Sequence, residues 1–275
     1  MLWISLSAFL TSAFAGAVVS EANADTSDPV FTCDFESPEW YREWGLDQPE
    51  PGTDTVTADP ALKFEPLRGK ALRVRIPKGG QVGMGKLKFR FKERTGVEPE
   101  EIYFRYYLRF ADDWDPEQNG KLPGIAGTYQ KAGWGGKRVN GQDGWSARGR
   151  FNQRVNGETP IGYYCYHADM RGNFGSPWLW EKDRLGYLKN NCWYCVEQYV
   201  RMNTPGRNDG IMRGWIDGQL AFEKTDARLR DTSDLKIELV WMDVYQGGKN
   251  PAKSEDHLYI DNVVIARSYI GPLSK

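Results

Sequence analysis

Histidine is scarce in this chain: only His167 and His257 occur among its 275 residues. A metal site built from several histidines is therefore excluded. The sequence also lacks H-E-x-x-H, G-x-S-x-G, the P-loop and the dinucleotide-binding fingerprint, which argues against zinc proteases, α/β-hydrolases and nucleotide-dependent enzymes. No E-x-D-x-x-E string is present, so the carboxylates of a laminarinase-type glycosidase are missing. A pair of carboxylates from separate strands stays open as an alternative.

Long apolar runs are absent after the first residues. The segment from Leu2 to Val19 is apolar or small and uncharged, and Ala22-Asn23-Ala24 has the form of a signal-peptidase cleavage site. No Lys or Arg precedes Arg42, so the basic start of a typical signal peptide is missing, and an uncleaved anchor is the alternative. We expect a signal peptide at 1–24 and a single domain over 25–275 that is secreted or periplasmic.

Cysteine is also rare. In an exported protein an even number of cysteines favours disulfides, and four cysteines allow three pairings. A zinc site of the form C-x-H and C-x-x-C, which would use His167, is the less favoured alternative. The four cysteines are Cys33, Cys165, Cys192 and Cys195.

Apolar residues alternate along most of the chain, and helical periodicity is weak. Ile102 to Phe110 alternates strictly, and Asp217-Gly218 between two apolar runs predicts a β-hairpin. About ten strands of this kind predict an all-β sandwich or barrel, with a first strand near Phe31 beside a last strand near Val264. The segment 111–144 is predicted to be irregular. The segment 178–191 is predicted to be a loop or a short helix, and 235–245 is predicted to be one long strand.

Positive charge is concentrated between Lys121 and Arg154, although the whole chain has 36 basic and 37 acidic residues. This stretch contains seven Lys or Arg and a single acid. A tyrosine-rich strand follows, in which period two places Tyr164 and Tyr166 on one face and Tyr163 on the other. A basic patch beside tyrosines predicts an anionic ligand that contains rings.

These residue types suit β-elimination from a uronic acid polymer, which removes the C5 proton beside the carboxylate and expels the C4 oxygen. Cations in a partly desolvated groove neutralise the carboxylate. Arg148 can bind it through two parallel hydrogen bonds, and Lys121 adds a point charge. The same cations would lower the pKa of a tyrosine from its usual ~10, so that it could act as the base. Ser146 shares a face with Arg148, because the two are two residues apart.

The ordered motifs K-L-P-G from Lys121, S-x-R at Ser146 and Arg148, and Y-x-Y at Tyr164 and Tyr166 resemble polysaccharide lyase family 14. The similarity extends from the strand near residue 104 to the last strand. It implies a single-domain, concanavalin-like jelly-roll β-sandwich. It also implies an enzyme that cleaves alginate or glucuronan, in which the matching lysine, serine, arginine and two tyrosines form the active cleft.

From the residues and this resemblance together, Tyr166 is expected to abstract the proton and Tyr164 to assist it or to donate to the leaving oxygen. Arg148 and Lys121 neutralise the carboxylate, and Ser146 positions it. The expected substrate-binding residues are Lys121, Arg148 and Arg150. The turn between S-x-R and Y-x-Y is longer than the family pattern, which leaves Arg150 as an alternative to Arg148, and Tyr163 as an alternative to Tyr164.

The expected partner is an anionic polysaccharide, with no nucleic acid, and no membrane after signal cleavage. We expect a monomer that needs no cofactor, and no metal-binding residues are assigned. Two rival classes remain: a non-catalytic carbohydrate-binding module and a glycoside hydrolase, each on the same scaffold.

Overall fold

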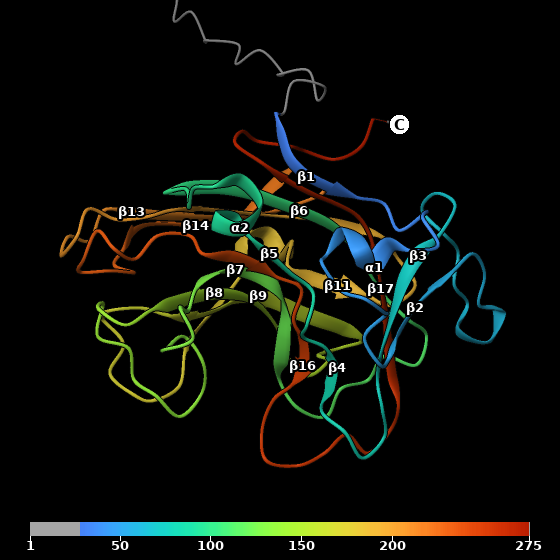
Figure 1. Ribbon diagram of the computed structural model, residues 1–275. Helices are drawn as coiled ribbons and strands as arrows, with labels where there is room; N and C mark the ends of the chain where they lie inside the picture. The colour runs from blue at the N-terminus through green and yellow to red at the C-terminus, as the bar shows by residue number, and fades with distance from the viewer. Residues whose placement is uncertain (1–27, 275) are drawn as a thin grey trace, which may run out of the picture.

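Two antiparallel β-sheets pack face to face around one core in the computed structural model, which describes residues 28–274 (Figure 1). The first sheet contains β1 (Pro29–Cys33), β2 (Thr53–Val56), β3 (Ala71–Ile76), β6 (Glu101–Phe110), β12 (Tyr194–Arg201), β13 (Gly210–Ile216), β14 (Gln219–Ala227) and β17 (Asp256–Ala266). Its order is β14-β13-β12-β6-β17-β3-β2, with β1 beside β17. These two layers confirm the predicted all-β jelly-roll sandwich.

The second sheet has nine strands. They are β4 (Val82–Met84), β5 (Lys88–Arg90), β7 (Gly120–Gly127), β8 (Trp145–Phe151), β9 (Glu158–Tyr166), β10 (Ser176–Leu179), β11 (Tyr187–Lys189), β15 (Leu239–Trp241) and β16 (Val244–Gln246). Its main order is β10-β9-β8-β7-β15-β5, while β11 pairs with β9, and β16 pairs with β4 and β7. Helical segments are short: α1 (Trp40–Glu43), α2 (Phe91–Thr95), η1 (Pro60–Leu62) and η2 (Lys182–Arg184).

Alternation decides which side chains of the second sheet enter the core. On β8 the side chains of Ala147 and Phe151 are buried in the core, and on β9 those of Tyr163 and Cys165 are. Because successive side chains of a strand point to opposite faces, the residues between them lie on the face turned away from the core. This outer face of β8 and β9 carries the polar residues on which the functional prediction rests.

Two predicted pairings are confirmed. Asp217 and Gly218 join β13 to β14 and both have positive φ, as a tight hairpin of this kind requires. Phe31 pairs with Ile265, and Thr32 with Val264, so the first and last strands lie side by side.

The expectation of an irregular segment at 111–144 is wrong in part, because its middle forms the strand β7. The segment has few β-branched residues and contains Pro123, which hid the strand. Pro123 is tolerated because the register of β7 and β8 shifts between Leu122 and Ile125. Gly124 is needed at this point, since a Cβ there would lie 2.5 Å from the carbonyl oxygen of Ala147.

The other two segments also differ from expectation. The region 178–191 contains a short helix, η2, which the expectation allowed, but it also contains the end of β10 and all of β11, which were not expected. The expected long strand at 235–245 is interrupted at Met242 and Asp243, which separate β15 from β16. This interruption lies beside the site described below.

All four cysteines are free, so the expected disulfides are not formed in the structure. Cys33 is on β1 and Cys195 on β12 of the first sheet, whereas Cys165 is on β9 of the second, and Cys192 is exposed. The expected signal peptide at 1–24 lies outside the described residues. Within residues 28–274, no helix is long and apolar enough to cross a membrane.

Candidate active site

The strand register brings the two predicted motifs together on β8 and β9. Ser146 lies directly opposite Tyr166, and Arg148 lies opposite Tyr164. Residues that face each other across antiparallel strands have Cβ atoms about 5 Å apart, so the pairs are neighbours. The longer turn between the strands does not shift this alignment, and Arg148 with Tyr164 is the pair that the structure brings together.

Lys121 joins them from β7, on the other side of β8. It pairs with Arg150 of β8 and with Tyr245 of β16. Lys121 was expected to reach the site on the long irregular segment at 111–144. The structure instead fixes its backbone between two strands, which holds its amine in a defined place.

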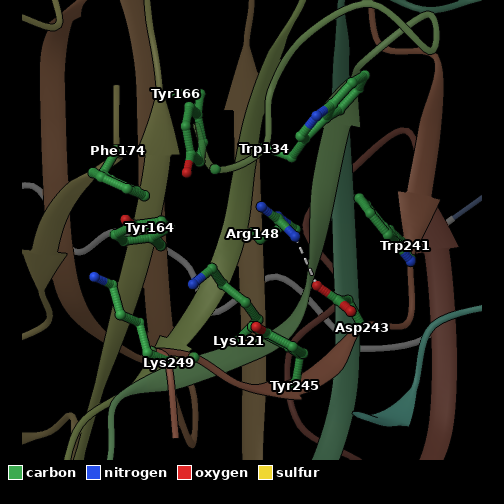
Figure 2. A pocket seen from close by; sticks show the side chains of 13 residues that line it. Lys121, Trp134, Arg148, Tyr164, Tyr166, Phe174, Trp241, Asp243, Tyr245 and Lys249 are labelled. Atoms are coloured by element: carbon green, nitrogen blue, oxygen red, sulfur yellow. Dashed lines mark hydrogen bonds and ion pairs between the residues drawn. The ribbon is translucent and has the colours of Figure 1, made fainter. Parts of the chain in front are cut away.

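A cleft of about 670 Å³ lies over these strands on the outer face of the second sheet (Figure 2). Its cations are Lys121, Arg148 and Lys249, and its acid is Asp243. Its aromatic residues are Trp134, Tyr164, Tyr166, Phe174, Trp241 and Tyr245. Cations and flat rings in one open groove are the features that bind a chain of charged sugars.

Two loops form one wall of this cleft. The segment 128–144 carries Trp134, and the segment 171–175 carries Phe174, whose side chain is 69% exposed. The N–H of Gly136 donates to the carbonyl of Asn173 at 3.1 Å and joins the two loops. An exposed aromatic ring at the rim of a polar groove suits stacking on a sugar.

Lys121 has an unusual protonation equilibrium. Burial lowers the pKa of its amine to about 7, with Arg148 and Arg150 acting in the same direction and Asp243 opposing them. Its Nζ lies 3.9 Å from the ring centroid of Tyr164, and Figure 2 shows the amine directed toward that ring. A lysine of this kind is largely neutral above neutral pH and can then accept a proton.

Arg148 is already held by protein groups. Its Nη1 donates to Oδ2 of Asp243 at 2.8 Å, and its Nη2 donates to the carbonyl of Gly133 at 3.3 Å. The guanidinium also lies 4.9 Å from the ring centroid of Trp241. Arg148 therefore supplies a fixed positive charge at the cleft. It is not free to form the two parallel hydrogen bonds to the substrate carboxylate that were expected from the sequence.

Tyr166 has its pKa raised, chiefly by burial and secondly by Tyr164, whereas Arg148 acts weakly in the opposite direction. The expectation that cations depress this pKa is therefore not met, because burial outweighs Arg148. Figure 2 shows the hydroxyl of Tyr166 directed into the cleft. At neutral pH this phenol keeps its proton and is suited to donate it.

The remaining predicted residues lie beneath or beside the cleft. Ser146 is fully buried and its hydroxyl donates to the carbonyl of Gly133 at 2.7 Å, so it supports the loop that also anchors Arg148. Arg150 donates from Nε to Asn152, and its guanidinium lies 5.3 Å from the ring centroid of Tyr164. Arg150 is thus at the edge of the site.

Tyr163, the alternative to Tyr164, points into the core, and its hydroxyl donates to the carbonyl of Arg213 at 2.6 Å. We expect Tyr163→Phe to lower the free energy of unfolding by about 1 kcal/mol, because a partly buried hydrogen bond is lost. Urea unfolding measures this loss. Activity should be unchanged, and a large loss of activity at wild-type stability would contradict the placement of Tyr163 outside the site.

Sequence reasoning missed several residues of the cleft. Trp241, Asp243 and Tyr245 are in phase with one another, and the signal that could have found them was a single acid, Asp243, among the otherwise apolar residues 239–245. Trp134, Phe174 and Lys249 lie in glycine-rich segments with no periodicity, so the sequence held no signal for their position.

Metal coordination finds no support in the part of the chain that the structure describes. There, no group of three or more His, Cys, Asp or Glu is arranged to hold a metal ion. The zinc alternative fails because Cys165 lies in the core, whereas Nε2 of His167 lies 2.8 Å from Oγ of Ser176.

Comparisons with known proteins identify the family and the fold. A model of the polysaccharide lyase 14 family matches residues 65–261. The PL-14 alginate lyase from Aplysia kurodai is 18% identical with a TM-score of 0.63, over 86% of this chain and 98% of that one. The endo-beta-1,4-glucuronan lyase from the fungus Trichoderma reesei is 13% identical with a TM-score of 0.53, over 87% and 96%.

A doubly substituted alginate lyase Aly36B in complex with alginate trisaccharide is 22% identical, with a TM-score of 0.61, over 72% of this chain and 82% of that one. At these identities the solved structures speak for the fold alone. No curated protein sequence matches the chain.

Proposed function

The chain belongs to polysaccharide lyase family 14 and is a polysaccharide lyase, and we propose that its substrate is a uronate polymer of the alginate or glucuronan type. We also propose that the enzyme is secreted or periplasmic, because polymers of this kind occur outside the cytoplasm. The observation that carries the substrate class is the placement of Lys121, Arg148, Tyr164 and Tyr166 in one open cleft. The alginate and glucuronan lyases with the same fold support this choice.

Charge neutralisation comes first in the proposed reaction. The substrate carboxylate lies among the cations of the cleft, with Arg148 as the fixed charge and Lys249 and Arg150 at its borders. Neutralising the carboxylate lowers the cost of the carbanion that forms when the C5 proton leaves. The aromatic rings of the cleft hold the sugar rings in place.

Proton transfer then uses two residues. The neutral amine of Lys121 takes the C5 proton, the electron pair forms the C4–C5 double bond, and the C4–O4 bond breaks. Tyr166 donates its proton to O4, and the proton returns from the Lys121 ammonium to the Tyr166 phenolate after product release. This division differs from the sequence prediction, in which Tyr166 was the base, because the pKa of Lys121 is lowered and that of Tyr166 is raised.

A panel of purified polyuronates tests the proposal. We expect cleavage of at least one polymer of the alginate or glucuronan type, with new ultraviolet absorbance from the unsaturated uronate at the new chain end. Neutral glucans of equal length serve as the control, and they should not be cleaved. Reducing ends that appear without this absorbance would favour a glycoside hydrolase, and binding without cleavage would favour a carbohydrate-binding module.

A further inference from the structure

We propose that Asp243 is a positioning residue of the cleft: its carboxylate holds the guanidinium of Arg148 in place and balances the positive charges around Lys121. The inference deepens the proposed function and rests on it, because it concerns how the same cleft is kept ready for the reaction. Asp243 belongs to none of the motifs by which the sequence indicated a lyase.

The geometry of the buried pair supports the positioning role. The side chains of Asp243 and Arg148 are each only 7% exposed, and Nη1 of Arg148 lies 2.8 Å from Oδ2 of Asp243. The carbonyl of Gly133 and the ring of Trp241 hold the guanidinium from other sides. An arginine held on several sides keeps one orientation before substrate arrives, which removes the entropy cost of ordering it during the reaction.

The local backbone explains why an acid reaches this place. Met242 and Val244 point into the core. Because side chains alternate, Asp243 between them points to the outer face with Trp241 and Tyr245. The break between β15 and β16 lies at this position, so the acid stands where the strand leaves its regular pairing.

The charges around Lys121 also depend on Asp243. The titratable and charged groups that face its amine come from β8, β9, β16 and the adjoining loops: Arg148, Arg150, Tyr164, Tyr245, Asp243 and Lys249. Among the described residues that line the cleft, Asp243 is the only acid. Arg148 and Arg150 lower the pKa of Lys121, and Asp243 raises it. Lys88 adds a further positive charge near Asp243.

Asp243→Asn tests this assignment, because it keeps the shape of the side chain and removes its charge. We expect kcat/KM to fall at least ~10-fold, as Arg148 loses its anchor. We also expect the rise of kcat/KM with pH, which reports the deprotonation of Lys121, to move to lower pH by roughly one to two units. Nuclear magnetic resonance of isotope-labelled lysine amines should show the same downward shift for Lys121, whose signal is assigned by its loss in Lys121→Gln.

Asp59→Asn is the matched control. Asp59 forms an ion pair of 2.7 Å with Arg73, which is on β3 of the first sheet, whereas the cleft lies on the second sheet. This variant should leave kcat/KM and the Lys121 titration unchanged. An Asp243→Asn protein that loses activity while Lys121 titrates as in the wild type would overturn the proposal, since a merely structural role predicts that result. Wild-type activity with an unshifted titration would overturn it as well.

Two further results separate the possible failures. A wild-type protein that cleaves no polyuronate contradicts the proposed function, but the Lys121 titration in Asp243→Asn still decides this inference. If Asp243→Asn does not fold, Asp243→Glu decides it: the charge stays, so the titration stays near its wild-type pH, while the longer side chain displaces Arg148 and lowers kcat several-fold. Full kcat in Asp243→Glu, or a shifted titration, would contradict the proposal.

Discussion

Replacement of Lys121 by glutamine is expected to lower kcat/KM about a thousandfold, the loss typical of removing a general base. The reason is that glutamine cannot accept the C5 proton, although it fills much of the same space between β8 and β16. In free-energy terms this is about 4 kcal/mol of transition-state stabilisation. The measurement is the initial rate of absorbance increase on the polyuronate that the wild type cleaves fastest.

The pH dependence identifies the role of the lysine. Below pH 7 the amine of Lys121 is protonated and cannot act as a base, and above its pKa of about 7 it is neutral. Wild-type kcat/KM should therefore rise with pH through about 7, since this ratio reports ionisations of the free enzyme. The residual activity of Lys121→Gln should lack this rise.

Stability provides the control for this variant. Burial of the ammonium holds the pKa of Lys121 below its unfolded value, so the charged form costs folding free energy at neutral pH. Lys121→Gln should accordingly unfold at the same temperature as the wild type or higher. Lys92→Gln, at an exposed position on α2, is the control and should change neither the unfolding temperature nor kcat/KM. Retention of more than a tenth of the wild-type kcat/KM in Lys121→Gln would contradict the assignment of the base.

Alternation alone was sufficient to predict one half of the site. Period two placed Ser146 with Arg148 and Tyr164 with Tyr166, and the structure brings these pairs face to face across β8 and β9. The prediction succeeded because the two strands follow each other directly in the sequence. A local pattern then determines both the face and the partner.

The other half depends on strands that are distant in sequence. Lys121 meets Tyr245 only because β7 pairs with β16, more than a hundred residues further along the chain. No single-sequence pattern specifies such a pairing. The glycine and proline residues of β7 also concealed the strand, so Lys121 was expected on a loop.

The protonation states could not be read from the sequence either. The cations were expected to lower the pKa of a tyrosine, but the pKa that is lowered is that of Lys121, chiefly by burial and secondly by Arg148 and Arg150. For Tyr166, burial outweighs the attraction of Arg148. Which effect is larger depends on how deeply each group is packed, and that is a property of the fold.

Removal of a single hydroxyl in Tyr166→Phe is expected to lower kcat by about two to four orders of magnitude while leaving KM close to that of the wild type. The ring still packs with Ala132, Val139 and Met170, so the fold and the shape of the cleft are retained. The leaving O4 oxygen, however, loses its proton donor. Steady-state kinetics on the best polyuronate measure the change, and binding of uncleaved polymer to the variant measures retained affinity.

Tyr163→Phe is a matched control, because it removes the same hydroxyl from a tyrosine three residues away on the opposite face of β9, and it should keep wild-type kcat. The pH profile distinguishes the two roles of Tyr166. As an acid with a raised pKa it stays protonated through the neutral range, so wild-type activity rises near pH 7 with Lys121 and does not fall at moderately alkaline pH. As a base it would require activity to rise only above the usual tyrosine pKa of ~10. Full kcat in Tyr166→Phe would exclude both roles and leave Tyr164 as the tyrosine that transfers the proton.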